Sequence, residues 1–140
     1  MNTALIIVDV QHDFCPGGAL GTDRGNEVAE KISSLQTEYD TVVATQDWHI
    51  DPGSHFAKDP DFVDSWPVHC VAGTAGAEYD PGLKTDAVTH HVKKGQGIPA
   101  YSLFEGTTDA GERVAELLTA HGVTEVDVTG IALTKLDGSS

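Results

Sequence analysis

The sequence predicts an α/β domain with a mainly parallel sheet, and three observations support this fold class. Residues 4–8 and 41–45 are short apolar runs without alternating polar positions, which is typical of strands buried on both faces. Segments with apolar residues at helical spacing lie between such runs. The resulting alternation of strand and helix favours parallel pairing through crossover connections.

The first three elements are marked by their apolar residues. Residues 4–8 read Ala-Leu-Ile-Ile-Val and end at Asp9, so we expect a buried strand there. In Gly25–Leu35 the apolar side chains recur at helical spacing, which predicts an amphipathic helix. The run Thr41–Thr45 is again apolar and β-branched, and it predicts the second strand.

The remaining elements are expected in the last third of the chain. A weaker strand is predicted over Ala87–Val92. Apolar spacing then predicts a helix that begins at Val114 and stops before Gly122, because glycine commonly follows the last residue of a helix. The run Val126–Ala132 predicts the last strand.

Composition excludes several classes of function. The chain has 140 residues, with 22 acidic and 8 basic side chains and a net charge of −14. Such a surface repels phosphates, so we expect neither nucleic acid nor a membrane surface as a partner. No run approaches the ~20 apolar residues of a membrane span, and the N-terminus lacks the basic residues of a secretion signal. We therefore expect a cytoplasmic protein in which Cys15 and Cys70 are reduced; the alternative is a single disulfide between them.

A candidate metal site lies in the segment between the second and third predicted strands. This segment, between Gln46 and Ala87, is rich in His, Asp, Gly and Pro and shows little periodicity. A loop as long as this is usually functional. Asp47 and His49 are two positions apart, which places them on one side of an extended chain. With His55 and His69 they could bind Zn²⁺, Fe²⁺ or Mn²⁺. The alternative is that these are solvated loop histidines.

Candidate catalytic residues follow the predicted strands. Asp9 stands at the carboxyl end of the first strand, where open α/β sheets place their active sites, so it is either a general base or a turn residue. Lys94 follows the third strand and either faces the same site or is solvated. Cys15 and Cys70 are weighed as nucleophiles, but neither lies at a strand-to-helix turn, so packing in the core is the default.

A series of motifs along the chain carries a resemblance to a known family. They read ALIIVDVQHDFCPGGA over 4–19, TQDWHIDPGSHF over 45–56, SWPVHCV over 65–71, Lys94-Gly95, AYSLFEG over 100–106 and VDVTGIA over 126–132. Residues 4–132 thus resemble the nicotinamidases of the isochorismatase-like cysteine hydrolase family. The resemblance implies a Rossmann-like parallel sheet flanked by helices, and hydrolysis of nicotinamide to nicotinate and ammonia in NAD salvage.

The resemblance also implies roles for individual residues. Asp9 would be the general base, and Lys94 the cation that lowers the pKa of the nucleophile. One Zn²⁺ or Fe²⁺, or alternatively Mn²⁺, would anchor the pyridine nitrogen of the substrate. Its ligands would be Asp47, His49, His55 and, less regularly, His69. The walls of the ring pocket would be Phe14, Trp66 and Tyr101, loop aromatics that could alternatively plug the core. Ile131 and Ala132 would form a cis peptide near the oxyanion hole.

The sequence departs from the family after Ala132. There the family continues Thr-Asp-x-Cys with Cys as nucleophile, whereas this chain ends the same stretch in Leu136. We therefore expect residues 1–132 to form a C-terminally incomplete domain and 133–140 an unrelated tail, from truncation, a frameshift or the boundary of the expressed piece. As written, the chain should lack turnover and should self-associate through an exposed sheet edge. Alternatives are a non-catalytic metal-binding pseudoenzyme and hydrolysis by metal-activated water.

Overall fold

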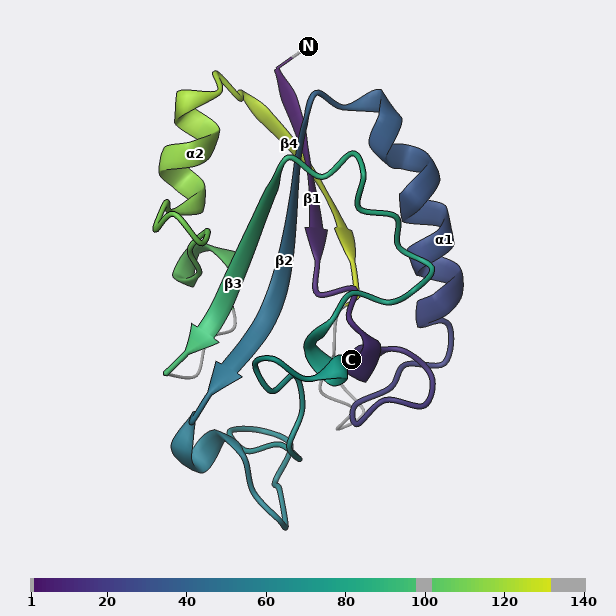
Figure 1. The fold of residues 1–140 in the computed structure, drawn as a ribbon, viewed down its shortest axis with the longest axis vertical. Helices are drawn as coiled ribbons and strands as arrows, with labels where there is room; N and C mark the ends of the chain where they lie inside the picture. The colour runs from purple at the N-terminus through teal and green to yellow at the C-terminus, as the bar shows by residue number, and fades with distance from the viewer. Residues whose placement is uncertain (1, 98–101, 132–140) are drawn as a thin grey trace.

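The computed structural model of the protein describes residues 2–97 and 102–131, and Figure 1 shows a sheet with one helix on each side. The strands are β1 (Thr3–Val8), β2 (Thr41–Ile50), β3 (His90–Gln96) and β4 (Glu125–Gly130), and the helices are α1 (Gly25–Leu35) and α2 (Val114–Ala120). The strand order is β3-β2-β1-β4, and all neighbouring strands are parallel. The predicted fold class is confirmed.

Both faces of β1 are buried, because its alternate residues point to opposite helices. Leu5 and Ile7 belong to the core cluster that contains Ile32 of α1. Ile6 belongs to the cluster that contains Leu117 of α2. Each of these side chains is at most 2% exposed. Burial on both faces is why β1 and the first half of β2 read as continuous apolar runs rather than as an alternating pattern.

Three predicted strands differ from the observed ones at their ends, and β4 ends at Gly130, before the end that was predicted for it. β2 continues to Ile50, so Asp47 and His49 belong to a strand and not to the loop in which they were expected. β3 begins at His90, later than predicted, and it includes Lys94, which was expected after the strand. Both extensions are polar, and they are held in the sheet by pairing between β2 and β3, with Asp47 opposite Lys94.

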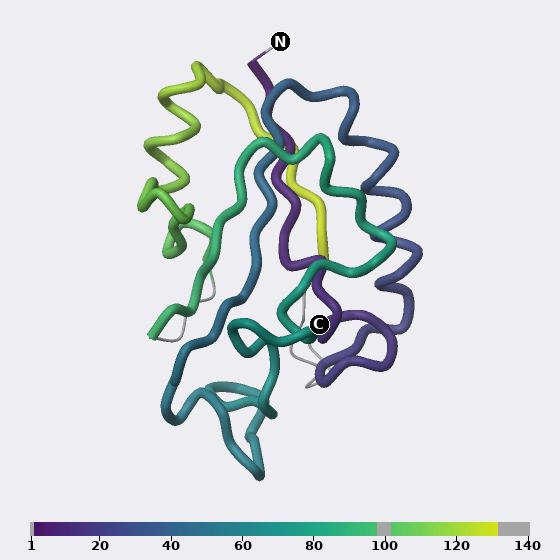
Figure 2. The backbone as a smooth tube through the Cα atoms, viewed as in Figure 1, coloured from purple at the N-terminus to yellow at the C-terminus, as the bar shows by residue number. Residues whose placement is uncertain are grey.

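The segment between β2 and β3 passes below the carboxyl ends of the strands and then returns beside α1 to the start of β3 (Figure 2). Its secondary structure consists of short 3₁₀ turns at Gly53–His55 and Ala75–Ala77 and of isolated bridges, one of which joins Gln11 to Tyr79. The segment thus covers the end of the sheet that carries the polar residues.

The strand β4 lies at the edge of the described sheet, beside β1. Val126 is 44% exposed and Val128 is 63% exposed. Within the described ranges, neither α1 nor α2 has the length and apolarity that a membrane-crossing helix requires.

Candidate active site and metal centre

Asp9, directly after β1, is held by its backbone and by its carboxylate. Its φ of 54° lies in the left-handed region that side chains rarely adopt, and its N–H donates to the backbone carbonyl of Thr45 at 3.2 Å. The Thr45 hydroxyl donates to Oδ1 of Asp9 at 2.8 Å. Nζ of Lys94 donates to Oδ2 of Asp9 at 2.7 Å. The turn after β1 therefore directs a nearly buried carboxylate at Lys94 of β3.

Lys94 lies between two carboxylates. Its Nζ is 2.7 Å from Oδ2 of Asp9 and 2.8 Å from Oδ1 of Asp47. The residue is only 3% exposed, and a buried ammonium requires such partners because burying an unpaired charge is very costly. With all three groups ionised, the cluster carries one negative charge in excess.

These contacts shift the pKa values of the three groups. Burial raises the pKa of Asp9, the charge of Asp47 adds to the rise, and Lys94 only partly opposes it. Burial also acts on Asp47, but the nearby imidazole of His49 and the charge of Lys94 outweigh it and lower the pKa of Asp47. The pKa of Lys94 is raised, because Asp9 and Asp47 outweigh the effect of burial. Asp9 is therefore the carboxylate better able to accept a proton.

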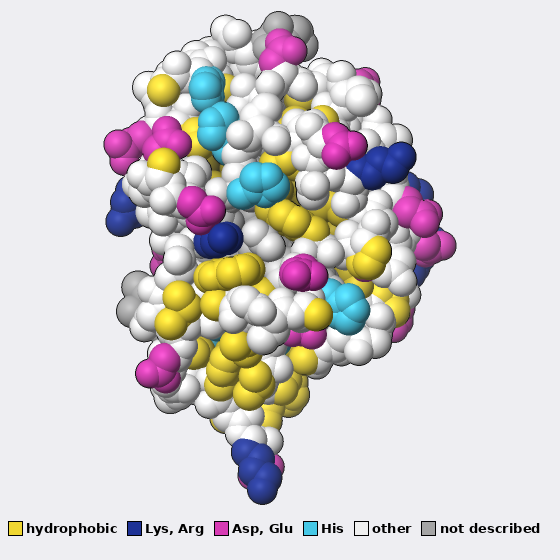
Figure 3. All heavy atoms as spheres, in the orientation of Figure 1, with side chains coloured by type: hydrophobic (Ala, Val, Ile, Leu, Met, Phe, Trp, Pro, Cys, Tyr) yellow, Lys and Arg dark blue, Asp and Glu magenta, His cyan; other side chains and the backbone are white. Residues whose placement is uncertain are grey.

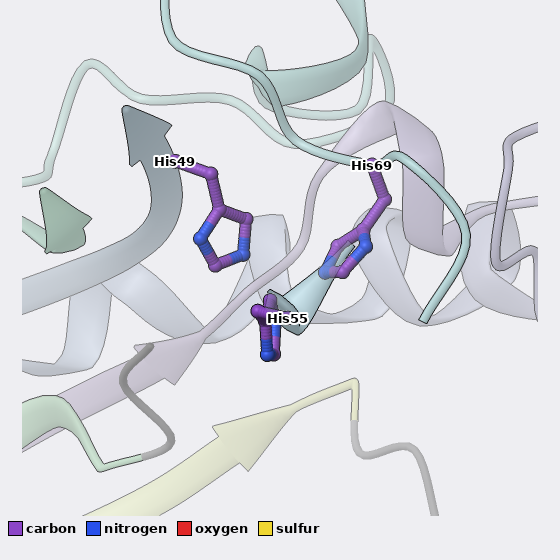
Figure 4. Close-up of side chains that lie close together, drawn as sticks. All are labelled: His49, His55 and His69. Atoms are coloured by element: carbon purple, nitrogen blue, oxygen red, sulfur yellow. The ribbon is translucent and has the colours of Figure 1, made fainter. Parts of the chain in front are cut away.

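Three imidazoles converge beside Asp47. Figure 4 shows His49, His55 and His69 arranged around a common space, and one ligand nitrogen from each lies within 4.8 Å of the others. Each residue is at most 4% exposed. Oδ2 of Asp47 lies 3.6 Å from Nε2 of His49 and 3.9 Å from Nε2 of His69. The structure thus brings together the four residues predicted as metal ligands.

The state of the ring nitrogens fits a divalent transition metal. Both nitrogens of His49 are buried without a hydrogen-bond partner among the described residues, which is costly for polar atoms unless something binds them. Nδ1 of His69 lies 2.7 Å from the carbonyl of Pro67. Because a carbonyl only accepts, Nδ1 carries the proton and Nε2 offers its lone pair, as in many metal-bound histidines. Imidazoles with one carboxylate suit Zn²⁺, Fe²⁺ and Mn²⁺.

Two residues that shape this cluster were missed from the sequence. The ring of Phe56 packs against His49, His55 and His69, with centroid distances of 5.2, 5.8 and 5.3 Å. Gly95 has φ +83°, and a Cβ at this position would lie 2.7 Å from Nδ1 of His49. Only glycine leaves that nitrogen room. Both residues stand inside quoted motifs, but no spacing rule points to their roles.

Gln11 was also missed, and it fixes the backbone of β2 at the site. Its Oε1 accepts the N–H of Asp47, and its Nε2 donates to the carbonyls of Asp47 and Ala77, each at 2.8 Å. Gln11 is fully buried. The available signal was a polar residue two positions after Asp9, close to a buried strand.

Two of the predicted ring-pocket residues are described. Phe14 is buried, and its ring centroid lies 5.8 Å from that of His69. Trp66 is half-buried, and its indole Nε1 has no hydrogen-bond partner within the described part of the chain. A bridge between Phe56 and Trp66 ties the tryptophan to the segment that carries His55.

Other predicted positions lie outside the described residues. These are Tyr101, the proposed cis peptide between Ile131 and Ala132, and Leu136 at the nucleophile position. Ile131 itself is 7% exposed, and its N–H donates to the carbonyl of Val8 at 2.9 Å.

The two cysteines are free and buried, as expected. Burial raises the pKa of Cys15 to about 12, and Asp80 adds to the rise. Burial, together with the charges of Asp47 and Asp13, raises the pKa of Cys70. Both thiols are therefore protonated at neutral pH, which disfavours either as a nucleophile.

Comparison with known proteins places this geometry in a family. Residues 3–134 match the isochorismatase domain. The nicotinamidase/pyrazinamidase of Mycobacterium tuberculosis is 51% identical over 132 residues, which are 92% of this chain and 71% of that protein. The pyrazinamidase of Pyrococcus horikoshii, solved in complex with zinc, is 34% identical with a TM-score of 0.72, and the match covers 94% of this chain and 72% of that one.

A third relative was solved with a small molecule bound. It is a protein of L. infantum in complex with nicotinate, 35% identical with a TM-score of 0.77, and the match covers 93% of this chain and 67% of that one. Family model, sequence relatives and solved structures agree, and the chain belongs to the isochorismatase family.

Proposed function

We propose that this chain is a nicotinamidase domain, in which Asp9 and Lys94 serve the hydrolysis of a pyridine carboxamide held beside a divalent metal. One observation carries the proposal. Asp47 contacts Lys94 through one oxygen and faces the imidazoles of His49 and His69 through the other. The proton-handling groups and the metal donors therefore form one continuous cluster. The nicotinate held by the L. infantum relative supports the substrate class.

The metal would be held by Asp47, His49, His55 and His69 as Zn²⁺ or Fe²⁺, with Mn²⁺ as a further choice. The donor types and the zinc complex of the P. horikoshii relative support this assignment. When bound, the metal supplies a Lewis-acidic contact for the ring nitrogen and so orients the substrate.

Asp9 and Lys94 would handle protons and charge. The raised pKa of Asp9 suits it to accept a proton from an attacking thiol and to pass it to the departing ammonia. Lys94 stays positively charged, because its pKa is raised, and it favours an anionic nucleophile nearby. Phe14 and Trp66 would line the ring of the substrate.

The proposed mechanism also needs an attacking thiol, and no cysteine of this chain is suited to supply it. The family's cysteine corresponds to Leu136, and neither Cys15 nor Cys70 is ionised at neutral pH. We therefore propose that the 140-residue chain, tested by itself, binds metal and carboxamide without turnover. In this form the chain would act as a non-catalytic metal-binding module.

The test compares ammonia release from nicotinamide by two proteins. One is the 140-residue chain, and the other is a chimera whose residues 133–140 are replaced by the C-terminal segment of the M. tuberculosis relative. We expect turnover from the chimera and its loss on Asp9→Asn. Loss of a triad nucleophile leaves at most about 10³–10⁴-fold acceleration over the uncatalysed reaction, which is far below the rate of an enzyme. The unmodified chain should therefore show no turnover on the time scale of the chimera. A folded but inactive chimera refutes the nicotinamidase assignment, and thiol-sensitive turnover by the unmodified chain refutes the missing nucleophile.

A further inference from the structure

A pair of histidines lies at the end of β3 opposite to the candidate active site. His90 begins β3, and His121 directly follows α2. Nε2 of one ring lies 3.2 Å from Nε2 of the other, and the ring centroids are 4.8 Å apart. Histidine side chains gather over this part of the molecule in Figure 3. At ~3.3 Å per residue, the strand places His90 about 13 Å from Lys94, so the pair is separate from the buried cluster.

We propose that His90 and His121 form a second site for a divalent transition metal such as Zn²⁺. Imidazole nitrogens bind Zn²⁺ at ~2.0–2.1 Å, so two nitrogens 3.2 Å apart would subtend an angle of about 100° at the ion. This angle lies between the octahedral and the tetrahedral values. The separation of the two nitrogens therefore already matches that of two ligands of one ion.

The hydrogen bonds around His90 prepare its Nε2 as a ligand. The hydroxyl of Thr89 donates to the carbonyl of Val42 at 2.9 Å and lies 2.9 Å from Nδ1 of His90. With the hydroxyl proton given to Val42, Nδ1 of His90 is the donor in the second contact, and Nε2 keeps its lone pair. This is the arrangement that orients metal-bound histidines, with the second ring nitrogen fixed by a hydrogen bond.

His121 completes the pair from the exposed side. Its Nε2 faces His90, and the ring is open to water, so its proton can reside on Nδ1 while Nε2 binds the ion. Water can fill the remaining positions. The negative charge of Glu112 acts on His90 from the segment before α2, and the chain as a whole carries −14, so the surroundings favour a cation.

A bound ion would connect two elements that are far apart in sequence. β3 and α2 already pack together through Val92 and Leu117. The site would add a direct link between the first residue of the strand and the end of the helix. Because only the folded chain holds the two rings together, binding should stabilise the fold.

Equilibrium dialysis of the full chain against Zn²⁺ tests the site. His121→Gln should bind one equivalent less than the wild type, or bind that equivalent at least tenfold more weakly. His12→Gln, at another exposed histidine, should match the wild type. His49→Ala should keep the equivalent that His121→Gln loses, which separates this site from the buried cluster. A wild type that binds no more Zn²⁺ than His121→Gln overturns the proposal.

A second readout does not depend on counting ions. Zn²⁺ should raise the Tm of His49→Ala, and this rise should vanish in the double variant His49→Ala/His121→Gln. Circular dichroism checks that both variants are folded. An equal rise in Tm in the two folded variants would also refute the site.

Discussion

Asp47 and Lys94 stand opposite each other in the pairing of β2 with β3, and Nζ of the lysine meets Oδ1 of the aspartate at 2.8 Å. The other carboxylate oxygen lies 3.6 Å from Nε2 of His49. One side chain therefore serves the ion pair and the metal donors at once. A change at Asp47 must act on both.

Replacing Lys94 by Met should destabilise the protein by about 3–5 kcal/mol at neutral pH, because Asp9 and Asp47 would remain buried without their cation. Without Lys94 their folded-state pKa values lie above the unfolded ones, so the destabilisation should shrink as the pH falls and the carboxylates protonate. Urea unfolding at several pH values measures this.

The neighbouring lysine provides a matched control. Lys93 pairs with Asp109 at 3.3 Å, and the aspartate side chain is 84% exposed. Nζ of Lys93 also lies 4.2 Å from the centroid of the Trp48 ring, so Lys93→Met should cost about 1–2 kcal/mol, still less than Lys94→Met. Equal losses at the two lysines would show that the buried ion pair does not have the role assigned to it.

His49→Ala should remove most of the tightly bound metal, since both of its ring nitrogens are buried at the cluster and have no partner within the described ranges. Elemental analysis of metal-replete protein should show one ion fewer in the variant than in the wild type, and equilibrium dialysis should show that the variant binds this ion at least tenfold more weakly. His12→Ala serves as the control. A His49→Ala variant that loses no tightly bound ion relative to the wild type would exclude this cluster as the metal centre.

The two cysteines should not react with iodoacetamide in the native protein at mildly alkaline pH, although they should react in urea. Burial raises the pKa of both thiols, to about 12 for Cys15, whereas an unfolded thiol ionises near ~8.5. The folded-state pKa is the higher one, so this contribution to stability is complete below ~8.5 and is lost as the pH rises above it. Native labelling as fast as labelling in urea would contradict the raised pKa values.

The 140-residue chain should self-associate through the edge of β4, where Val128 is 63% exposed. Exposed apolar edge strands pair with other chains. Val128→Lys should shift the sedimentation profile toward monomer, whereas Val63→Lys, at an exposed valine outside the sheet, should not. A wild-type chain that sediments as a monomer at all concentrations would refute this.

The fold was predictable where burial is apolar. The helix expected at Gly25–Leu35 has those bounds, and β1 lies within one residue of its expected range. β2 was cut short at Thr45 because Asp47 and His49 are polar, and apolar periodicity treats polar residues as exposed. In the folded chain their polar atoms face one another and Lys94, and this lets a strand continue through them.

The candidate site was predictable in its members but not in its connections. The Asp-x-His spacing and the motifs indicate Asp47 and His49, and the position of Asp9 directly after the first predicted strand indicates Asp9. That Lys94 would bridge the two aspartates depends on the register between β2 and β3. Contacts of this kind join residues far apart in sequence, and local spacing carries no information about them.

The register of β2 and β3 also links the metal centre to folding fidelity. A slip of β3 by one residue would turn Lys94 to the opposite face of the sheet, because side chains alternate along a strand. Asp47 would then lose its counter-ion, although the content of strand and helix would stay the same. Spectroscopy that measures secondary-structure content would thus not detect a mispaired chain, but such a chain would bind its metal ion more weakly. Metal retention is therefore a measure of correct strand alignment.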